Sequence, residues 1–251
     1  MQSNGKHNLR LDNTLVEQGL VPSRARARDL IRRGLVEVAG VVETRPAAGV
    51  AAGTAIRVAA AAAAHVSRGA EKLIAALEHF AFPVEGVVAL DIGASTGGFT
   101  QVLLERGAAR VYAVDVGHGQ LDARLASDAR VVAFEGLDAR SLDRRRIAEP
   151  VGAIVADLSF ISLAKALPAA LALAATAAWV IALIKPQFEV GPALVGKGGI
   201  VRDRAARQGA VDQVESWMAG QPGWRVLGVF ASPIAGKSGN AEFLLGAVRD
   251  G

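Results

Sequence analysis

The chain has 251 residues, of which 51% are hydrophobic, and it carries a formal net charge of +4. This length and composition allow one large domain or two modest domains with full cores, and they exclude a chain that is mainly disordered. The absence of cysteine excludes disulfides and cysteine-based metal or redox chemistry, and no metal site is expected.

Positive charge is concentrated in the first quarter of the chain. Residues 1–60 hold nine lysines and arginines against five acidic residues, whereas the rest of the chain holds 19 of each. An excess of this kind in one segment is typical of a contact with nucleic acid or another acidic surface. The sequence therefore predicts that the first segment carries such a contact.

Residues 9–58 are predicted to form a small α+β domain. Apolar residues recur at helical spacing in a first helix, which Gly19 helps to end, and they are Leu11, Leu15, Val16 and Leu20. Ser23 is the candidate N-cap of a second helix over residues 24–33, whose arginines are expected on the exposed side. The inward positions of this second helix are Ala27, Leu30 and Ile31. Short strands are expected over 35–38, 41–42 and 55–58.

The motifs of this segment resemble the S-four-type RNA-binding domain, which is named after a small-subunit ribosomal protein. Their order is an arginine-leucine-aspartate start at 10–12, a glycine-leucine-valine turn at 19–21, a basic helix and a second glycine-leucine-valine at 34–36. In that family two helices lay a basic face on structured RNA. The resemblance implies RNA contacts at Arg10, Arg24, Arg26, Arg28, Arg32 and Arg33. The alternative is that these arginines form a solvated helix face.

Residues 67–251 are predicted to form a second domain, joined to the first by an alanine-rich linker over 59–66. Strand signals alternate with helical stretches, which predicts a doubly wound α/β sheet. The seven expected strands span 87–91, 110–115, 130–134, 152–157, 179–184, 225–231 and 241–247. The last two strands are close in sequence, as in the Rossmann-like sheet of methyltransferases, which ends in a hairpin.

One uncharged run, over residues 166–184, is long enough to be mistaken for a membrane span. Pro168 lies near its start, and the run ends in the β-rich segment 179–184. A buried helix followed by a central strand is therefore predicted, because strands covered on both faces are apolar throughout. Together with the lack of a leader pattern, this interpretation predicts no stable membrane insertion and a cytoplasmic location.

A glycine-rich turn follows the first strand of the second domain and predicts a cofactor site. Its pattern, Asp91-x-Gly93-x-Ser95-x-Gly97-Gly98, has a serine where dinucleotide sites need a glycine for the pyrophosphate. S-adenosylmethionine has no phosphate, and Asp91 suits its ammonium group. This cofactor is therefore favoured over a nicotinamide cofactor.

Acids at the ends of later strands complete the predicted cofactor site. Asp115 suits the two ribose hydroxyls and Asp138 suits the adenine amino group, while a helix cap or a loop salt bridge is the alternative role of each acid. The expected cofactor contacts are Asp91, Gly93, Ser95, Thr96, Gly97, Gly98, Phe99, Asp115, Asp138 and Asp157.

The chain also resembles the FtsJ-like ribose 2′-O-methyltransferases in a tetrad of charged residues, Lys72, Asp157, Lys185 and Glu242. The stretches around these residues, among them DIGASTGGFT, ADLSFISL and LIKPQFEVG, are similar to the TlyA family, which joins an S-four-type domain to an FtsJ-like domain. Members of that family methylate ribosomal RNA at cytidine 2′-hydroxyls. The resemblance implies an enzyme that uses S-adenosylmethionine and acts on ribosomal RNA or ribosomal subunits.

The expected chemistry is activation of a ribose 2′-hydroxyl, which must lose its proton as it attacks the methyl group. Lysine has an ordinary pKa of about 10.4 and is a base only where burial or a neighbouring cation lowers that pKa. Lys185 is expected to be this base or to polarise the hydroxyl. The other three tetrad residues are expected to orient it and to balance charge. The loop over 191–203 is expected to cover the substrate or to be a passive surface loop.

Two other function classes stay open at this point. One is a non-catalytic RNA-binding or ribosome assembly factor, against which the intact glycine turn and the complete tetrad argue. The other is a membrane-active haemolysin, a name that the TlyA family has carried. The absence of a leader pattern and of a predicted span argues against this second class.

Overall fold

The computed structural model describes residues 9–21, 23–59, 65–236 and 239–250. The chain divides into two compact units, Met1–Ser67 and Arg68–Gly251, and each is described by itself. No helix within the described ranges is long and apolar enough to cross a membrane.

The first unit packs two short helices against small antiparallel sheets. Its elements are β1 (Leu9–Arg10), α1 (Leu11–Glu17), α2 (Arg24–Arg32), β2 (Val36–Val38), β3 (Val41–Val42), β4 (Gly49–Val50) and β5 (Ile56–Val58). β2 lies between β3 and β5, and β1 pairs with β4. The β1–β4 pair was not predicted, because each strand has only two residues and carries no periodicity of its own.

The helices of the first unit begin where the sequence predicts. Ser23 caps α2, since its side-chain Oγ accepts a hydrogen bond from the Arg26 N–H at 3.3 Å. The three inward positions predicted on α2 are all fully buried in the core of this unit. Leu20 lies beyond α1 and is 38% exposed, so its predicted place on the face of the first helix is wrong. The reason is that α1 already ends at Glu17 and Gly19 turns the chain with a φ of +67°.

The second unit is built on a seven-stranded sheet with the order β11-β12-β10-β9-β6-β7-β8. Its strands are β6 (Val88–Ile92), β7 (Arg110–Asp115), β8 (Val131–Glu135), β9 (Val151–Ala156), β10 (Ala174–Ile184), β11 (Trp224–Ala231) and β12 (Phe243–Arg249). β12 runs antiparallel to both of its neighbours, and the remaining pairs are parallel. The predicted doubly wound sheet with a terminal hairpin is therefore confirmed.

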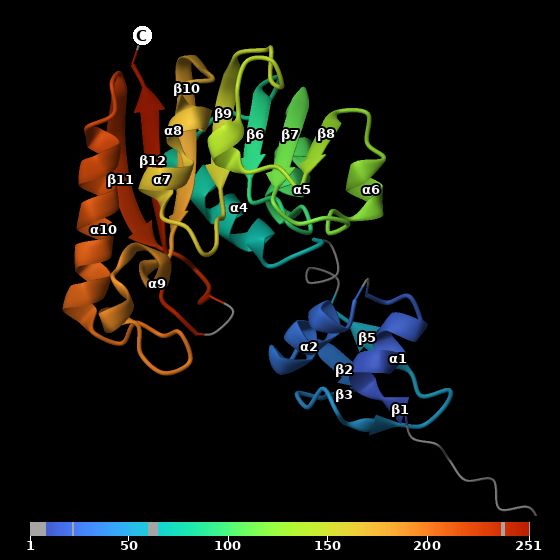
Figure 1. Cartoon of the computed structure of the whole chain (residues 1–251). Coiled ribbons are helices and arrows are strands. Elements are labelled where there is room, and N and C mark those ends of the chain that lie inside the picture. The colour runs from blue at the N-terminus through green and yellow to red at the C-terminus, as the bar shows by residue number, and fades with distance from the viewer. Residues whose placement is uncertain (1–8, 22, 60–64, 237–238, 251) are drawn as a thin grey trace, which may run out of the picture. The chain divides into compact units, whose positions relative to one another are not determined.

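Helices cover both faces of this sheet (Figure 1). α4 (Gly69–Phe80) and α5 (Gly98–Glu105) pack on one face. The long α10 (Arg204–Ala219) packs on the other face with the short α7 (Leu163–Ala166) and α8 (Pro168–Leu171). Single-turn elements complete the unit, namely α6 (Ala123–Ala126), η1 (Ala139–Ser141), α9 (Pro186–Glu189) and η2 (Pro192–Leu194).

The uncharged run over 166–184 differs in part from its prediction. The central strand is present, but β10 begins at Ala174 rather than at residue 179, and the preceding helices have only four residues each. Pro168 begins α8 instead of continuing α7, because it has no N–H to donate. Pairing of Ala174 with Val151 of β9 then overrides the helix preference of the alanines.

Two glycines of the second unit test how tightly this fold is packed. A Cβ at Gly246 in β12 would lie 2.6 Å from ring atoms of Phe80 on α4, whereas a Cβ at Gly209 in α10 would meet nothing within 4 Å. Gly246→Ala is expected to lower the free energy of unfolding by about 1–3 kcal/mol through overpacking. Gly209→Ala is expected to raise it by about 0.5–1 kcal/mol by restricting the unfolded chain.

Urea unfolding of the two glycine variants, followed by circular dichroism, measures both changes. Equal effects of the two substitutions would contradict the assigned contact between β12 and α4.

Candidate active site

A cavity of about 470 Å³ lies where parallel strands of the second unit end. β6, β7 and β9 run in parallel, so their carboxyl ends share one edge of the sheet, which is where open α/β sheets bind ligands. Half of the ten predicted cofactor residues line this cavity, and these are Gly93, Ser95, Asp115, Asp138 and Asp157. The other five do not line it, and these are Asp91, Thr96, Gly97, Gly98 and Phe99.

Gly93 lets the turn after β6 approach the end of β9. Its φ is +82°, and a Cβ at this position would lie 2.7 Å from the backbone oxygen of Asp157. Any other residue would therefore push the two strand ends apart. Gly97 is needed for a different reason, because its Cβ would overlap the side chains of Leu121 and Leu125. The glycine pattern thus serves packing as well as the cavity.

Asp91 is buried beneath the turn rather than exposed on the cavity wall. Thr100 Oγ1 donates a hydrogen bond to Asp91 Oδ2 at 2.6 Å, while Asp91 Oδ1 has no hydrogen-bond partner within the described part of the chain. Complete burial raises the pKa of the Asp91 carboxyl to about 7. The free Oδ1 is a buried acceptor available to a donor group.

Asp115 ties the glycine turn to the loop after β7 through its two carboxylate oxygens. Oδ2 accepts a hydrogen bond from the Ser95 N–H at 2.8 Å, and Oδ1 accepts one from the Gly117 N–H at 2.7 Å. A carboxylate has about four acceptor sites, so each oxygen keeps one for a ligand. Asp115 therefore combines a structural role with a free acceptor on the cavity wall.

Asp138 fills the alternative role that the sequence left open for it. Its side chain caps η1 by accepting from the Arg140 N–H at 2.9 Å, and it pairs with Arg140 Nη2 at 2.6 Å. The hydrogen bond from the Arg140 side chain lowers the pKa of the Asp138 carboxyl to about 2. Both residues also line the cavity, so this acid reaches it already paired with a cation.

The four tetrad residues form an alternating row of charges. Lys72 Nζ lies 2.6 Å from Glu242 Oε2 and 4.0 Å from Asp157 Oδ2, and Lys185 Nζ lies 2.6 Å from Asp157 Oδ1. Lys72, Lys185 and Glu242 are only 7%, 9% and 5% exposed. Buried charges cost desolvation energy unless they are paired, and groups of them mark functional sites more often than chance placement does.

Neighbouring strands and one helix bring the tetrad together. Asp157 and Lys185 follow the adjacent parallel strands β9 and β10, which pair up to Ala156 and Ala182. Glu242 directly precedes β12, the neighbour of β10 on its other side, and Lys72 reaches the row from α4. These elements thus bring the four tetrad residues together in the structure.

Three residues that the sequence did not single out support this row. Lys185 Nζ donates a hydrogen bond to Ser159 Oγ at 3.0 Å. A Cβ at Gly236 would overlap Glu242 Oε1, so only glycine leaves room for that carboxylate. Asn240 is buried two residues before Glu242 and ties down the 191–203 loop. Its Oδ1 accepts from the Val201 N–H at 3.0 Å, and its Nδ2 donates to the Gly199 carbonyl at 2.7 Å.

Phe160 stands at the rim of the cavity. Its side chain is 91% exposed and its φ is +66°, a conformation that is strained for a bulky residue. Its ring lies 5.1 Å from that of Phe188, and both rings line a second cavity of about 730 Å³ that also includes Arg140. An aromatic residue three positions after Asp157, in the segment between the predicted strand and the next helix, was the signal in the sequence.

The arginines implied as RNA contacts occupy two kinds of position in the first unit. Arg10, Arg24 and Arg28 surround Asp12, and Arg32 is exposed on the surface. Arg26 is only 9% exposed, because it bonds to Asp29 and to the His65 carbonyl, so its expected place on the exposed side is wrong. Arg33 lies 3.7 Å from Asp29.

Comparison with known proteins places the chain in a family. The model of the FtsJ-like methyltransferases matches residues 65–249, which include the glycine turn and the whole tetrad. The chain belongs to the FtsJ-like methyltransferase family. The model of the S4 domain matches residues 9–56, so the second predicted resemblance is confirmed as well.

Relatives with similar sequences span nearly the whole chain. The 16S/23S rRNA (cytidine-2′-O)-methyltransferase TlyA of Mycobacterium tuberculosis is 49% identical over 94% of this chain and 88% of that protein. Hemolysin A of Brachyspira hyodysenteriae is 39% identical over 94% of this chain and 98% of that protein. The predicted family and the predicted class of enzyme, a methyltransferase, are therefore confirmed.

Solved structures confirm the architecture. A protein from Streptococcus thermophilus described as a hemolysin is 36% identical, with a TM-score of 0.76 over 98% of this chain and 90% of that one. An O-methyltransferase from Bacillus cereus in complex with SAH is 19% identical, with a TM-score of 0.51 over 74% of this chain and 84% of that one, and it shows the fold alone.

Asp91 makes the stability of the protein depend on pH. Its folded pKa of about 7 lies above its ordinary value of 3.8, so its contribution to stability is full below about pH 4 and is lost as pH rises through 7. Asp91→Asn is expected to flatten the decline in the free energy of unfolding between about pH 4 and 7. One proton changes this slope by at most about 1.4 kcal/mol per pH unit.

Urea unfolding at several pH values checks the Asp91 prediction. Asp128→Asn is the matched control, because the guanidinium of Arg130 holds the pKa of Asp128 at about 2, outside this pH range. Parallel pH profiles for Asp91→Asn and the unchanged protein would show that Asp91 does not titrate in this way.

Proposed function

We propose that this chain transfers a methyl group from S-adenosylmethionine to the 2′-hydroxyl of a cytidine ribose in ribosomal RNA. The observation that carries the proposal is the row Glu242–Lys72–Asp157–Lys185, whose two lysines and Glu242 are buried and whose Asp157 also lines the cavity at the strand ends. The name of the M. tuberculosis relative supports the substrate and the position of modification.

The residues of the cavity fit the proposed cofactor. When bound, S-adenosylmethionine supplies an electrophilic methyl group on a sulfonium. Asp115 would accept hydrogen bonds from ribose hydroxyls through its free acceptor sites, and the buried Asp91 Oδ1 offers an unpaired acceptor below the turn. Ser95 replaces the glycine that a pyrophosphate needs, which argues against a dinucleotide at this turn.

Lys185 is the tetrad residue proposed to handle the hydroxyl proton. Asp157 and Ser159 hold its Nζ at 2.6 and 3.0 Å, which fixes where the amine points. Lys72 is neutralised mainly by Glu242 at 2.6 Å rather than by Asp157 at 4.0 Å, so Asp157 is left to orient Lys185. Lys185 would accept the 2′-hydroxyl proton or polarise its O–H bond, while the other three residues keep it in place.

The rim of the cavity and the first unit suit an RNA substrate. The exposed ring of Phe160 offers a stacking surface for a base, which is how proteins commonly hold unpaired nucleotides. The S4 domain carries the excess positive charge of the chain, and phosphate contacts of arginine supply affinity without reading sequence. The proposed ribosomal target places the reaction in the cytoplasm.

Lys185→Ala is expected to reduce methyl transfer by about 10²–10⁴-fold, the usual contribution of a general base, and to leave cofactor binding in place. Transfer of labelled methyl groups to ribosomal subunits measures activity, and calorimetry measures S-adenosylmethionine binding. Lys185→Arg keeps the cation without an effective base, so it separates proton acceptance from polarisation. Arg225→Ala, which removes a cation paired with Asp250 on the edge strand, is the control. Near-normal transfer by Lys185→Ala would contradict the assigned role.

Mapping 2′-O-methyl groups in ribosomal RNA from cells with and without the protein tests the proposed substrate. At least one cytidine is expected to lose its methyl group when the protein is absent and to regain it with the unchanged chain but not with Lys185→Ala. Unchanged methylation together with altered subunit assembly would instead support a non-catalytic assembly factor.

A further inference from the structure

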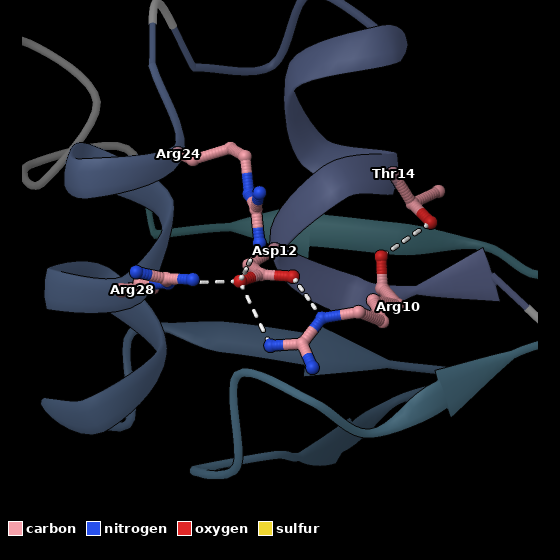
Figure 2. A network of polar contacts seen from close by, with 5 residues as sticks. All are labelled: Arg10, Asp12, Thr14, Arg24 and Arg28. Atoms are coloured by element: carbon pink, nitrogen blue, oxygen red, sulfur yellow. Dashed lines mark hydrogen bonds and ion pairs between the residues drawn. The ribbon is translucent and has the colours of Figure 1, made fainter.

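Asp12 lies at the centre of three arginines in the first unit (Figure 2). Arg10 donates to Oδ1 from Nε at 3.0 Å and to Oδ2 from Nη2 at 3.2 Å. Arg24 Nη2 and Arg28 Nε donate to the same Oδ2 at 3.2 and 2.9 Å. The side chain of Asp12 is completely buried by these contacts and by the fold around it.

The carboxylate of Asp12 accepts hydrogen bonds from four guanidinium N–H groups, three at Oδ2 and one at Oδ1. Most of its acceptor capacity is therefore used by the three arginines. Three positive charges against one negative charge leave the cluster with a net positive charge. The hydrogen bond from Arg10, followed by those from Arg28 and Arg24, holds the pKa of Asp12 well below its usual range, so the carboxylate stays ionised at neutral pH.

The three arginines keep most of their donors for a partner. Their side chains are 46%, 50% and 43% exposed for Arg10, Arg24 and Arg28, whereas Asp12 is inaccessible. A guanidinium has five N–H donors in one rigid plane, so fixing one or two of them also fixes where the others point. Arg24 and Arg28 use only one nitrogen each on Asp12, and among the described residues their remaining donors are available to other groups.

The backbone around this cluster is itself held in place. The Asp12 N–H donates to the Pro46 carbonyl at 3.0 Å, and Thr14 Oγ1 donates to the Arg10 carbonyl at 3.0 Å. Arg24 and Arg28 lie one helical turn apart on α2, while Arg10 ends β1 and Asp12 belongs to α1. One carboxylate therefore gathers cations from a strand and a helix.

We propose that Asp12 is a positioning residue that presents Arg10, Arg24 and Arg28 as one preorganised surface for the phosphates of folded RNA. The inference rests on the proposed function, because it assumes that the first unit binds ribosomal RNA. Three long side chains lose little further rotamer freedom on binding when one buried acid already holds them. Phosphate accepts bidentate hydrogen bonds from guanidinium groups, which matches the donors left over.

A simple charge argument predicts the opposite effect for removal of Asp12. Asp12→Asn makes the cluster more positive by one charge, so electrostatics alone would tighten RNA binding. Positioning predicts weaker binding, because an amide offers one acceptor oxygen and turns a donor toward the guanidinium groups. The sign of the change therefore separates the two roles.

Binding of the full chain to purified ribosomal subunits, measured over a range of salt concentrations, tests the proposal. Asp12→Asn is expected to weaken binding by at least about tenfold and to lower the salt slope by about one unit for each phosphate contact that is lost. Glu43→Gln is the matched control. It adds the same charge, but among the described residues the cation that Glu43 pairs with is the single exposed Arg45, at 2.8 Å, so binding is expected to stay equal or to tighten slightly.

Circular dichroism and urea unfolding show whether Asp12→Asn is folded. A folded variant that binds as tightly as the unchanged protein, or more tightly, overturns the proposal. If the variant does not fold, substitutions of Arg28 test the proposal instead, because its side chain is 43% exposed and is not part of the core. Arg28→Lys keeps the charge without the planar fork, and it is expected to lose as much binding as Arg28→Ala. Retention of binding by Arg28→Lys overturns the proposal.

The arginine variants distinguish a wrong role for Asp12 from a wrong proposed function. If Arg24→Ala and Arg28→Ala leave binding to subunits unchanged, the first unit does not bind this RNA, and the proposed function loses its RNA-binding part. If these variants weaken binding but a folded Asp12→Asn does not, only the role of Asp12 is wrong. On the Asp12→Asn background, Arg28→Ala is expected to cause little further loss, since the two residues act as a unit.

Discussion

Parallel pairing of β9 with both β6 and β10 is the constraint on which the site of the second unit depends. It places the ends of three strands at one edge of the sheet, so Asp157 meets the glycine turn on one side and Lys185 on the other. The close approach of Gly93 to the Asp157 backbone sets the spacing between the cavity and the tetrad. A displacement of β9 would therefore disturb the cavity and the charged row together.

Each unit uses one carboxylate to organise several cations. Asp157 stands between Lys72 and Lys185, and Asp12 stands among three arginines. Burying a charged group costs several kcal/mol unless opposite charges and hydrogen bonds compensate, and that cost falls on Asp12 in the first unit and on the two lysines and Glu242 in the second. The two sites differ in how far their cationic side chains are exposed. The lysines are almost fully buried beside a cavity, while the arginines keep half of their surface exposed to a large partner.

Much of the fold and of the site followed from local patterns. Apolar strands that end in acids, a glycine turn and capped helices predicted the seven strands, and the tetrad was recognised from the residues around each member. Local patterns do not decide between two possible partners of one residue. Asp138 caps η1 and pairs with Arg140 while it lines the cavity. Arg26, which reads as one more basic surface residue, is buried against Asp29 and the His65 carbonyl. Ala174 joins a strand because β9 offers it a partner.

The sequence by itself determined the family, the positions of the seven strands along the chain and the residue types at the site. Each of these is encoded within a short stretch. Only the tertiary structure decided which side chains from distant segments contact one another. Lys72 and Glu242 are 170 positions apart, and no pattern in the sequence near either residue predicts that their side chains lie 2.6 Å apart. The role of Asp12 was equally hidden, since its partners lie on another helix and on a two-residue strand. Contacts between distant segments depend on how whole elements pack, and that information is spread over the entire chain.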